Sequence, residues 1–91
     1  MTIRFDLTPR MAELAGFRRT GLQLPEGAAL ADAIQGLRLE LLRGPGSVLV
    51  SNGSLLPSVL VVVDGEACPP GANPLLAEGA VIHLLLPVAG G

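Results

Sequence analysis

One long amphipathic segment, residues 28–43, restricts this chain to folds in which a single main helix packs against another layer. Its apolar residues recur at helical spacing and form one stripe, which a helix buries against a partner surface. A Gly-Pro-Gly run at residues 44–46 ends the segment. Gly27 or Ala28 is expected as a poor N-cap, and Gly36 lowers helix propensity, so packing must hold this helix. The stripe consists of Leu30, Ala33, Ile34, Leu37 and Leu41.

The segments around this helix carry strand patterns. Residues 2–8 alternate between apolar and polar side chains, and residues 18–24 return to an extended pattern. Residues 58–63 form an apolar run rich in β-branched side chains, and residues 47–50 are expected to be a short strand or extended piece. Residues 80–86 are nearly all apolar, which suits a central strand covered on both faces, or on one face plus a partner protein.

Shorter patterns complete the predicted order of elements. Residues 9–17 carry a short helical pattern, and the Ser-Asn-Gly-Ser run at residues 51–54 is typical of a turn. Asp64-Gly65 predicts a tight turn, and residues 68–74, with three prolines, predict a loop. The order of elements therefore favours an α+β fold, in which the main helix packs across one sheet.

The composition is unusually apolar for so small a chain. Apolar residues make up 49% of it and charged residues 15%, against a typical charged share of about 25%. Two interpretations stay open. One is an exposed apolar face reserved for a partner protein, and the other is simply a composition rich in Ala, Leu, Val and Gly.

Few side chains offer chemistry of their own. His83 is the only histidine and Cys68 the only cysteine, so we expect no metal site, no disulfide and no His-based catalytic pair. We interpret His83 as a strand residue, Cys68 as a passive thiol, and Asp64 and Glu66 as solvated turn residues. The chain is not expected to be an enzyme.

Charge and hydropathy patterns exclude further classes. The net charge is −2, all six arginines lie at or before Arg43, and no basic cluster is interleaved with aromatic residues, so nucleic-acid binding is not expected. No apolar run approaches the ~18–20 residues that span a membrane, and the first residues show no signal-peptide pattern. A cytoplasmic location is therefore expected.

The last residues are the candidate functional site. We expect one domain over residues 1–86, followed by a flexible Gly-Gly tail at residues 87–91. Pro87 fixes one φ angle where the tail leaves the last strand. Without Cβ atoms, Gly90 and Gly91 can thread a narrow channel and present an unhindered carboxylate.

Several motifs along the chain resemble the ThiS/MoaD family of bacterial sulfur carriers, which are relatives of ubiquitin. The resemblance covers the opening strand, the entry to the main helix, a strand and turn, and the last seven residues, which resemble the family's "LPPVSGG" ending. The matching runs are Ile3-Arg4-Phe5 with Met11-Ala12-Glu13-Leu14-Ala15-Gly16, Leu24-Pro25-Glu26-Gly27 with Leu30-Ala31-Asp32-Ala33-Ile34, Val61-Val62-Val63-Asp64-Gly65-Glu66, and Leu85-Leu86-Pro87-Val88-Ala89-Gly90-Gly91.

The resemblance implies a ubiquitin-like β-grasp, a mixed sheet of four to five strands with one main helix across it. It also implies a mechanism. A ubiquitin-activating-enzyme-like adenylyltransferase would use ATP to convert the Gly91 carboxylate to an acyl-adenylate, and a sulfur donor would convert that to a thiocarboxylate. An acceptor sulfurtransferase subunit would then receive the sulfur. Gly90 would thread the partner's channel, and Pro87, Val88 and Ala89 would shape the tail and contact partners. The chain itself would bind no cofactor.

The pathway stays open among several alternatives. The ending at Pro87-Val88 favours the small subunit of molybdopterin synthase, and hence molybdenum cofactor biosynthesis. Other candidates are a carrier for cysteine, thiamine or a specialised sulfur metabolite, a ubiquitin-like protein modifier, and a β-grasp interaction module whose Gly-Gly ending has no role. The chain has no lysine, so it cannot form lysine-linked chains on itself.

Overall fold

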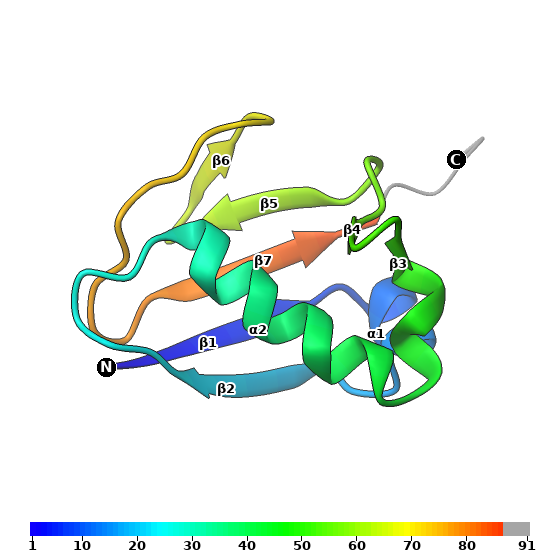
Figure 1. Ribbon diagram of the computed structural model, residues 1–91. Coiled ribbons are helices and arrows are strands. Elements are labelled where there is room, and N and C mark those ends of the chain that lie inside the picture. The colour runs from blue at the N-terminus through cyan, green and yellow to red at the C-terminus, as the bar shows by residue number, and fades with distance from the viewer. Residues whose placement is uncertain (87–91) are drawn as a thin grey trace.

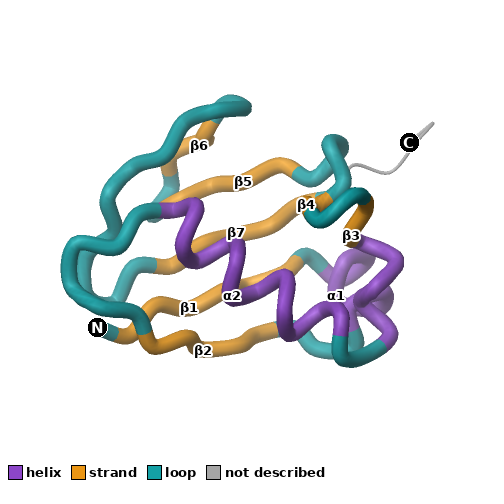
Figure 2. Tube along the Cα trace, in the orientation of Figure 1, coloured by secondary structure: helices purple, strands orange, loops and turns teal. Residues whose placement is uncertain are grey.

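The computed structural model describes residues 1–86, which form one mixed sheet with a main helix across one of its faces (Figure 1). Figure 2 shows the helices on one side of the strands, so the architecture has two layers. In chain order the elements are β1 (Thr2–Leu7), α1 (Pro9–Ala15), β2 (Arg19–Gln23), α2 (Leu30–Leu42), the 3-10 helix η1 (Pro45–Leu49), β3 (Val50–Ser51), β4 (Ser54–Leu55), β5 (Leu60–Val63), β6 (Glu66–Cys68) and β7 (Val81–Leu85).

The five-stranded sheet has the order β2-β1-β7-β5-β6, which places β7 in the middle. β1 and β7 pair in parallel, whereas β1 with β2, β5 with β7 and β5 with β6 pair antiparallel. This arrangement confirms the predicted β-grasp and the predicted central position of residues 80–86.

The core lies between α2 and the sheet face that α2 covers. Alternate residues of β1 and β7 point into it, as the period-2 pattern requires. Leu37 and Leu41 of the predicted helical stripe pack against these residues from α2. The largest fully buried side chains are Ile3, Phe5, Leu7, Met11, Leu37, Leu41, Leu49, Ile82 and Leu84.

The start of α2 differs from the prediction. Its N-cap is Ala29, not Gly27 or Ala28, and this side chain has no acceptor. The N–H groups of Ala29, Leu30 and Ala31 instead donate to the Asp32 carboxylate and to the loop before β7. A loop more than forty residues along the chain therefore does part of the work of an N-cap. The bonds run from Ala29 to Asp32 Oδ2 (2.9 Å), from Leu30 to the Pro74 carbonyl (2.9 Å) and from Ala31 to Asn73 Oδ1 (2.7 Å).

The segment after α2 corrects a second prediction. Residues 47–50 were expected to be extended, but Pro45–Leu49 forms the 3-10 helix η1 and only Val50–Ser51 is a strand. Close packing explains the difference. A Cβ atom on Gly46 would lie 2.6 Å from Leu41 Cδ2 and 3.2 Å from the Ala15 Cα. Gly46 therefore lets η1 approach both helices while Leu49 becomes fully buried.

The predicted tight turns are confirmed. Asp64 and Gly65 have φ angles of 47° and 87° and join β5 to β6 as a two-residue hairpin turn. Asn52 and Gly53, at 53° and 77°, join β3 to β4 in the same way. β6 itself was not predicted: Glu66 was interpreted as a turn residue and Cys68 as the first residue of the proline-rich loop, whereas both lie in this short strand beside β5.

Candidate functional site

The candidate site begins where β7 ends, in the middle of the sheet. Leu84 is fully buried, and its carbonyl accepts a hydrogen bond from the Thr8 N–H at 3.2 Å. On the other side, Leu85 is paired with Leu60 of β5. The strand that leads to residues 87–91 is therefore held from both sides up to Leu85.

The five predicted tail residues, Pro87, Val88, Ala89, Gly90 and Gly91, lie outside the described residues. Their roles therefore stay predictions. The structure places Leu86, the residue before them, which is half-buried against the core.

The sheet face opposite α2 carries an apolar area next to this exit, which we call the open-face patch. It consists of Leu60, Val62, Val81 and Leu85, which alternate with the core-facing residues of β5 and β7, and the exposed His83 lies between Val81 and Leu85 on the same face. Leu60 is 53% exposed. A shallow hollow of about 300 Å³ at the border of β5 and β6 has Leu60, Val62 and Leu85 in its lining. Such a patch at the rim of a polar surface is typical of a protein-binding site.

The other half of the same face, over β1 and β2, is charged. The Asp6 carboxylate forms two ion pairs, with Oδ2 3.1 Å from the Arg19 Nε and Oδ1 3.9 Å from the Arg18 Nε. Arg4 is exposed on the same strand, and His83 lies beside Asp6 in the register of β1 and β7. The face therefore offers an apolar half and a polar half, the usual composition of a protein interface.

The side chains interpreted as unreactive occupy structural positions. His83 is exposed on its strand, as predicted. The Asp64 carboxylate accepts a hydrogen bond from the Val81 N–H at 2.9 Å, which ties the β5–β6 turn to β7. Cys68 is half-buried, with its Sγ 3.8 Å from the Glu66 carbonyl oxygen.

Residues 1–86 contain no group of three or more His, Cys, Asp or Glu side chains placed to hold a metal ion. In the same range, no helix has both the length and the apolar character needed to cross a membrane.

Comparison with known proteins decides the family. The model of the ThiS family matches residues 7–91, which is most of the chain. The chain belongs to the ThiS family. The predicted resemblance is thereby confirmed, and it places this ThiS-family protein among sulfur carriers and ubiquitin-like modifiers. No curated protein sequence matches it significantly.

Solved structures agree with the family match. SAMP1 of Haloferax volcanii is 27% identical with a TM-score of 0.79, and the alignment covers 100% of both chains. A Pyrococcus furiosus protein provisionally described as molybdopterin converting factor subunit 1 is 22% identical with a TM-score of 0.71, covering 97% of this chain and 99% of that one. Urm1 of Sulfolobus solfataricus is 13% identical with a TM-score of 0.57, covering 91% and 97%. The last two similarities concern the fold alone.

The sequence pattern points to the tail but does not place the open-face patch. The signal for the patch is the nearly unbroken apolar run at residues 80–86, which predicted a strand covered on both faces, or on one face plus a partner protein. The pairing of that run with β5 is what assembles the patch, and only the register of the sheet shows which side chains meet there.

Proposed function

We propose that this ThiS-family protein is a sulfur carrier whose working group is the carboxylate of Gly91. The observation that carries the proposal is the family match, which includes the central strand β7 and continues to residue 91. The folded body acts as a handle, and the chain is a carrier and not a catalyst.

The first step requires an adenylyltransferase. One Gly91 carboxylate oxygen attacks the α-phosphorus of ATP, pyrophosphate leaves, and an acyl-adenylate forms. The carboxylate is ionised at neutral pH, because the terminal carboxyl group of a peptide loses its proton in the acidic range, well below neutrality. Gly90 and Gly91 have no Cβ atoms, which suits passage through a narrow channel to that phosphate.

The second step replaces AMP with sulfur. A sulfide-level donor, HS⁻, attacks the acyl carbon and displaces AMP, and loss of a proton leaves Gly91 with a thiocarboxylate, which is a soft nucleophile. An acceptor sulfurtransferase subunit then receives the sulfur, and hydrolysis returns the carboxylate. Molybdopterin formation is the first pathway to test, because the ending at Pro87-Val88 resembles that of the molybdopterin-type carriers. Carriers for cysteine, thiamine or a specialised sulfur metabolite follow.

The open-face patch supplies a recognition surface for these partners. It adjoins the exit of β7, so a partner that covers Leu60 and Leu85 also sits where the tail begins. Buried apolar contacts at the centre of an interface contribute most of its binding energy, whereas the charged rim sets orientation.

A second candidate is a ubiquitin-like protein modifier, in which the activated Gly91 is joined to a target amine. SAMP1 is the small archaeal modifier protein 1 of Haloferax volcanii, and its similarity to this chain, at 27% identity over all of both chains, favours this candidate specifically. Both functions share the adenylation step and differ in the nucleophile that displaces AMP.

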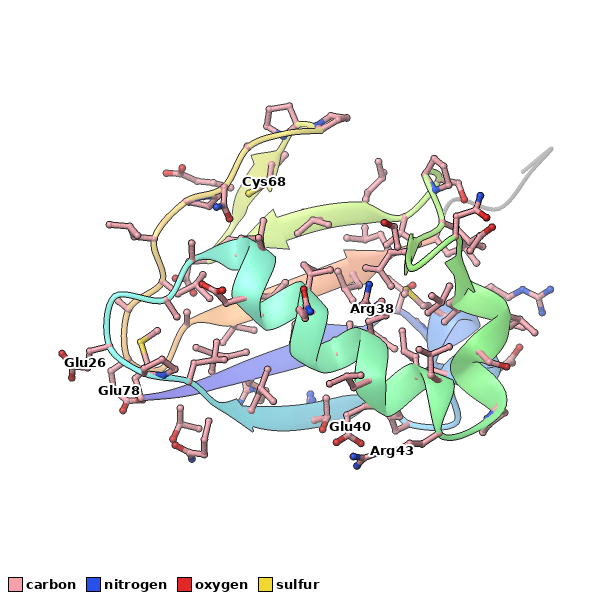
Figure 3. All side chains as sticks on the ribbon, viewed as in Figure 1. Glu26, Arg38, Glu40, Arg43, Cys68 and Glu78 are labelled. Carbon is pink, nitrogen blue, oxygen red and sulfur yellow. The ribbon has the colours of Figure 1, made fainter. Side chains whose placement is uncertain are left out.

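Pyrophosphate exchange with a family adenylyltransferase tests the shared step. We expect ATP-dependent exchange with the intact chain and none when Gly91 is deleted. Glu26→Gln, at an exposed position far from the end of β7 (Figure 3), keeps the final carboxylate and serves as the control. Exchange that persists without Gly91 would contradict the proposed role of that residue.

A further inference from the structure

A cleft on the helix side of the molecule contains one arginine that the proposed carrier chemistry does not use. The cleft lies between α2, the β3–β4 hairpin and the loop after β6 (Figure 3). It consists of two adjoining hollows of about 400 Å³ and 270 Å³, which share Leu30, Ile34 and Leu55 in their linings. The 270 Å³ hollow reaches the sheet edge at Leu60, which also belongs to the open-face patch, whereas the 400 Å³ hollow beside Arg38 contains no residue of that patch.

The walls of the cleft are mostly apolar. Leu30 and Ile34 line it from α2. Leu55 lines it from the hairpin, Val59 from the segment before β5, and Val61 from β5. A closed cavity of about 150 Å³ is enough to hold benzene, so each hollow has room for one leucine or phenylalanine side chain. Both hollows are open to solvent, a shape that suits side chains presented on a protein surface.

Arg38 is the only charged side chain among the described lining residues of either hollow. Figure 3 shows it on the side of α2 toward the hairpin, where its Nη1 donates to the Gly53 carbonyl. Its Nε–H is buried and has no acceptor within residues 1–86. The four ion pairs of that range involve Arg10, Arg18, Arg19 and Arg43, and none involves Arg38.

This combination is chemically specific. A guanidinium group has five N–H donors in a planar fork, and a carboxylate is the acceptor that matches this fork best. Within residues 1–86, no carboxylate forms an ion pair with this half-buried cation. Its position at the edge of an apolar cleft complements an acidic side chain that has a bulky apolar neighbour.

We propose that this cleft binds a segment of a partner protein in which a glutamate or aspartate is flanked by large apolar side chains. The acidic side chain pairs with Arg38, and the apolar neighbours fill the hollows lined by Ile34 and Leu55. The protein thereby has a second contact surface, centred on Arg38 and distinct from Gly91, that meets the open-face patch only at Leu60.

Two blocked peptides, acetyl-Gly-Phe-Glu-Leu-Gly-amide and the same peptide with Gln in place of Glu, test the proposal on the unmodified chain. In ¹⁵N-labelled protein, the Glu peptide is expected to shift the amide signals of Ile34, Gln35, Leu55 and Ala72. The Gln peptide is expected to bind at least about tenfold more weakly, because hydrogen bonds to charged groups are the strong ones.

Variants on α2 provide the second arm. Arg38→Gln is expected to weaken the Glu peptide by about tenfold or more. Arg43→Gln, which alters an exposed arginine on the opposite side of the helix (Figure 3), is expected to leave binding unchanged within about twofold.

Four outcomes would each overturn the proposal: no binding at millimolar peptide, equal binding of the two peptides, shifts centred on Val62 and His83, or equal losses in the two variants. Binding that appears only after residues 87–91 are removed would make the chain's own tail the occupant, and would overturn it as well.

Discussion

At the residue scale, two aspartate side chains accept hydrogen bonds from backbone N–H groups, and one of them replaces a missing N-cap acceptor. α2 begins at an alanine, which cannot cap it, so the Asp32 carboxylate accepts the Ala29 N–H at 2.9 Å. Asp64 acts similarly between two strands, since its carboxylate accepts the Val81 N–H while its own N–H donates to the Val81 carbonyl. Each carboxylate satisfies backbone donors that would otherwise cost free energy on burial.

Replacing Asp32 tests this role. Asp32→Ala is expected to lower the free energy of unfolding by about 1 kcal/mol, because the Ala29 N–H loses its acceptor near the positive end of the helix dipole. Glu40→Ala, at an exposed position of the same helix, is the control and is expected to change it by less than about 0.5 kcal/mol. Urea unfolding followed by circular dichroism measures both. Equal effects of the two substitutions would contradict the capping role.

At the scale of elements, the connection from α2 to β3 depends on a close approach. Gly46 brings η1 against the end of α1 and against Leu41, and this approach buries Leu49 completely. Close packing of this kind leaves no room for an added methyl group, because protein interiors are about as dense as organic crystals.

Gly46→Ala is therefore expected to destabilise the protein by about 1–3 kcal/mol, the usual cost of overpacking. Gly44→Ala is the matched control, because nothing lies within 4 Å of a Cβ atom placed there. Its free energy of unfolding is expected to stay within about 0.5 kcal/mol of that of the parent protein. The packing argument would be wrong if both variants had the same thermal unfolding midpoint.

The same elements show what the sequence could predict. The helical stripe at residues 28–43, the alternation at residues 2–8 and the Asp64-Gly65 turn are local patterns, and the structure confirms each. The N-cap of α2 and the 3-10 helix η1 depend on contacts with residues far along the chain, such as Asn73 and Ala15. Local patterns carry no information about such contacts, so these two predictions were wrong.

At the scale of the whole molecule, the candidate site divides into a part that the sequence shows and a part that it does not. The Gly-Gly ending is visible in the sequence, and its role stays a prediction because residues 87–91 lie outside the described residues. The open-face patch exists only once β5 pairs with β7, and the Arg38 cleft exists only once the β3–β4 hairpin lies beside α2.

The proposed docking role of the open-face patch can be tested with two exposed leucines. Leu60, in the patch, is 53% exposed, and Leu39, on α2, is 52% exposed. Leu60→Asp is expected to lower kcat/KM for adenylation by about tenfold or more, mainly through KM, because it places a charge at the centre of an apolar contact. Leu39→Asp is expected to leave kcat/KM for adenylation within about twofold of the parent value. Equal losses would contradict a docking role for this face, and unfolding curves of both variants exclude loss of the fold.

The central claim is that Gly91 carries sulfur, and the intact mass of the protein tests it most directly. The chain is incubated with ATP, a family adenylyltransferase and a sulfide source, beside a control that lacks Gly91. We predict a mass gain that corresponds to exchange of one oxygen for one sulfur in the intact chain only. Pyrophosphate exchange without any gain of sulfur would contradict the carrier function and favour the protein modifier instead.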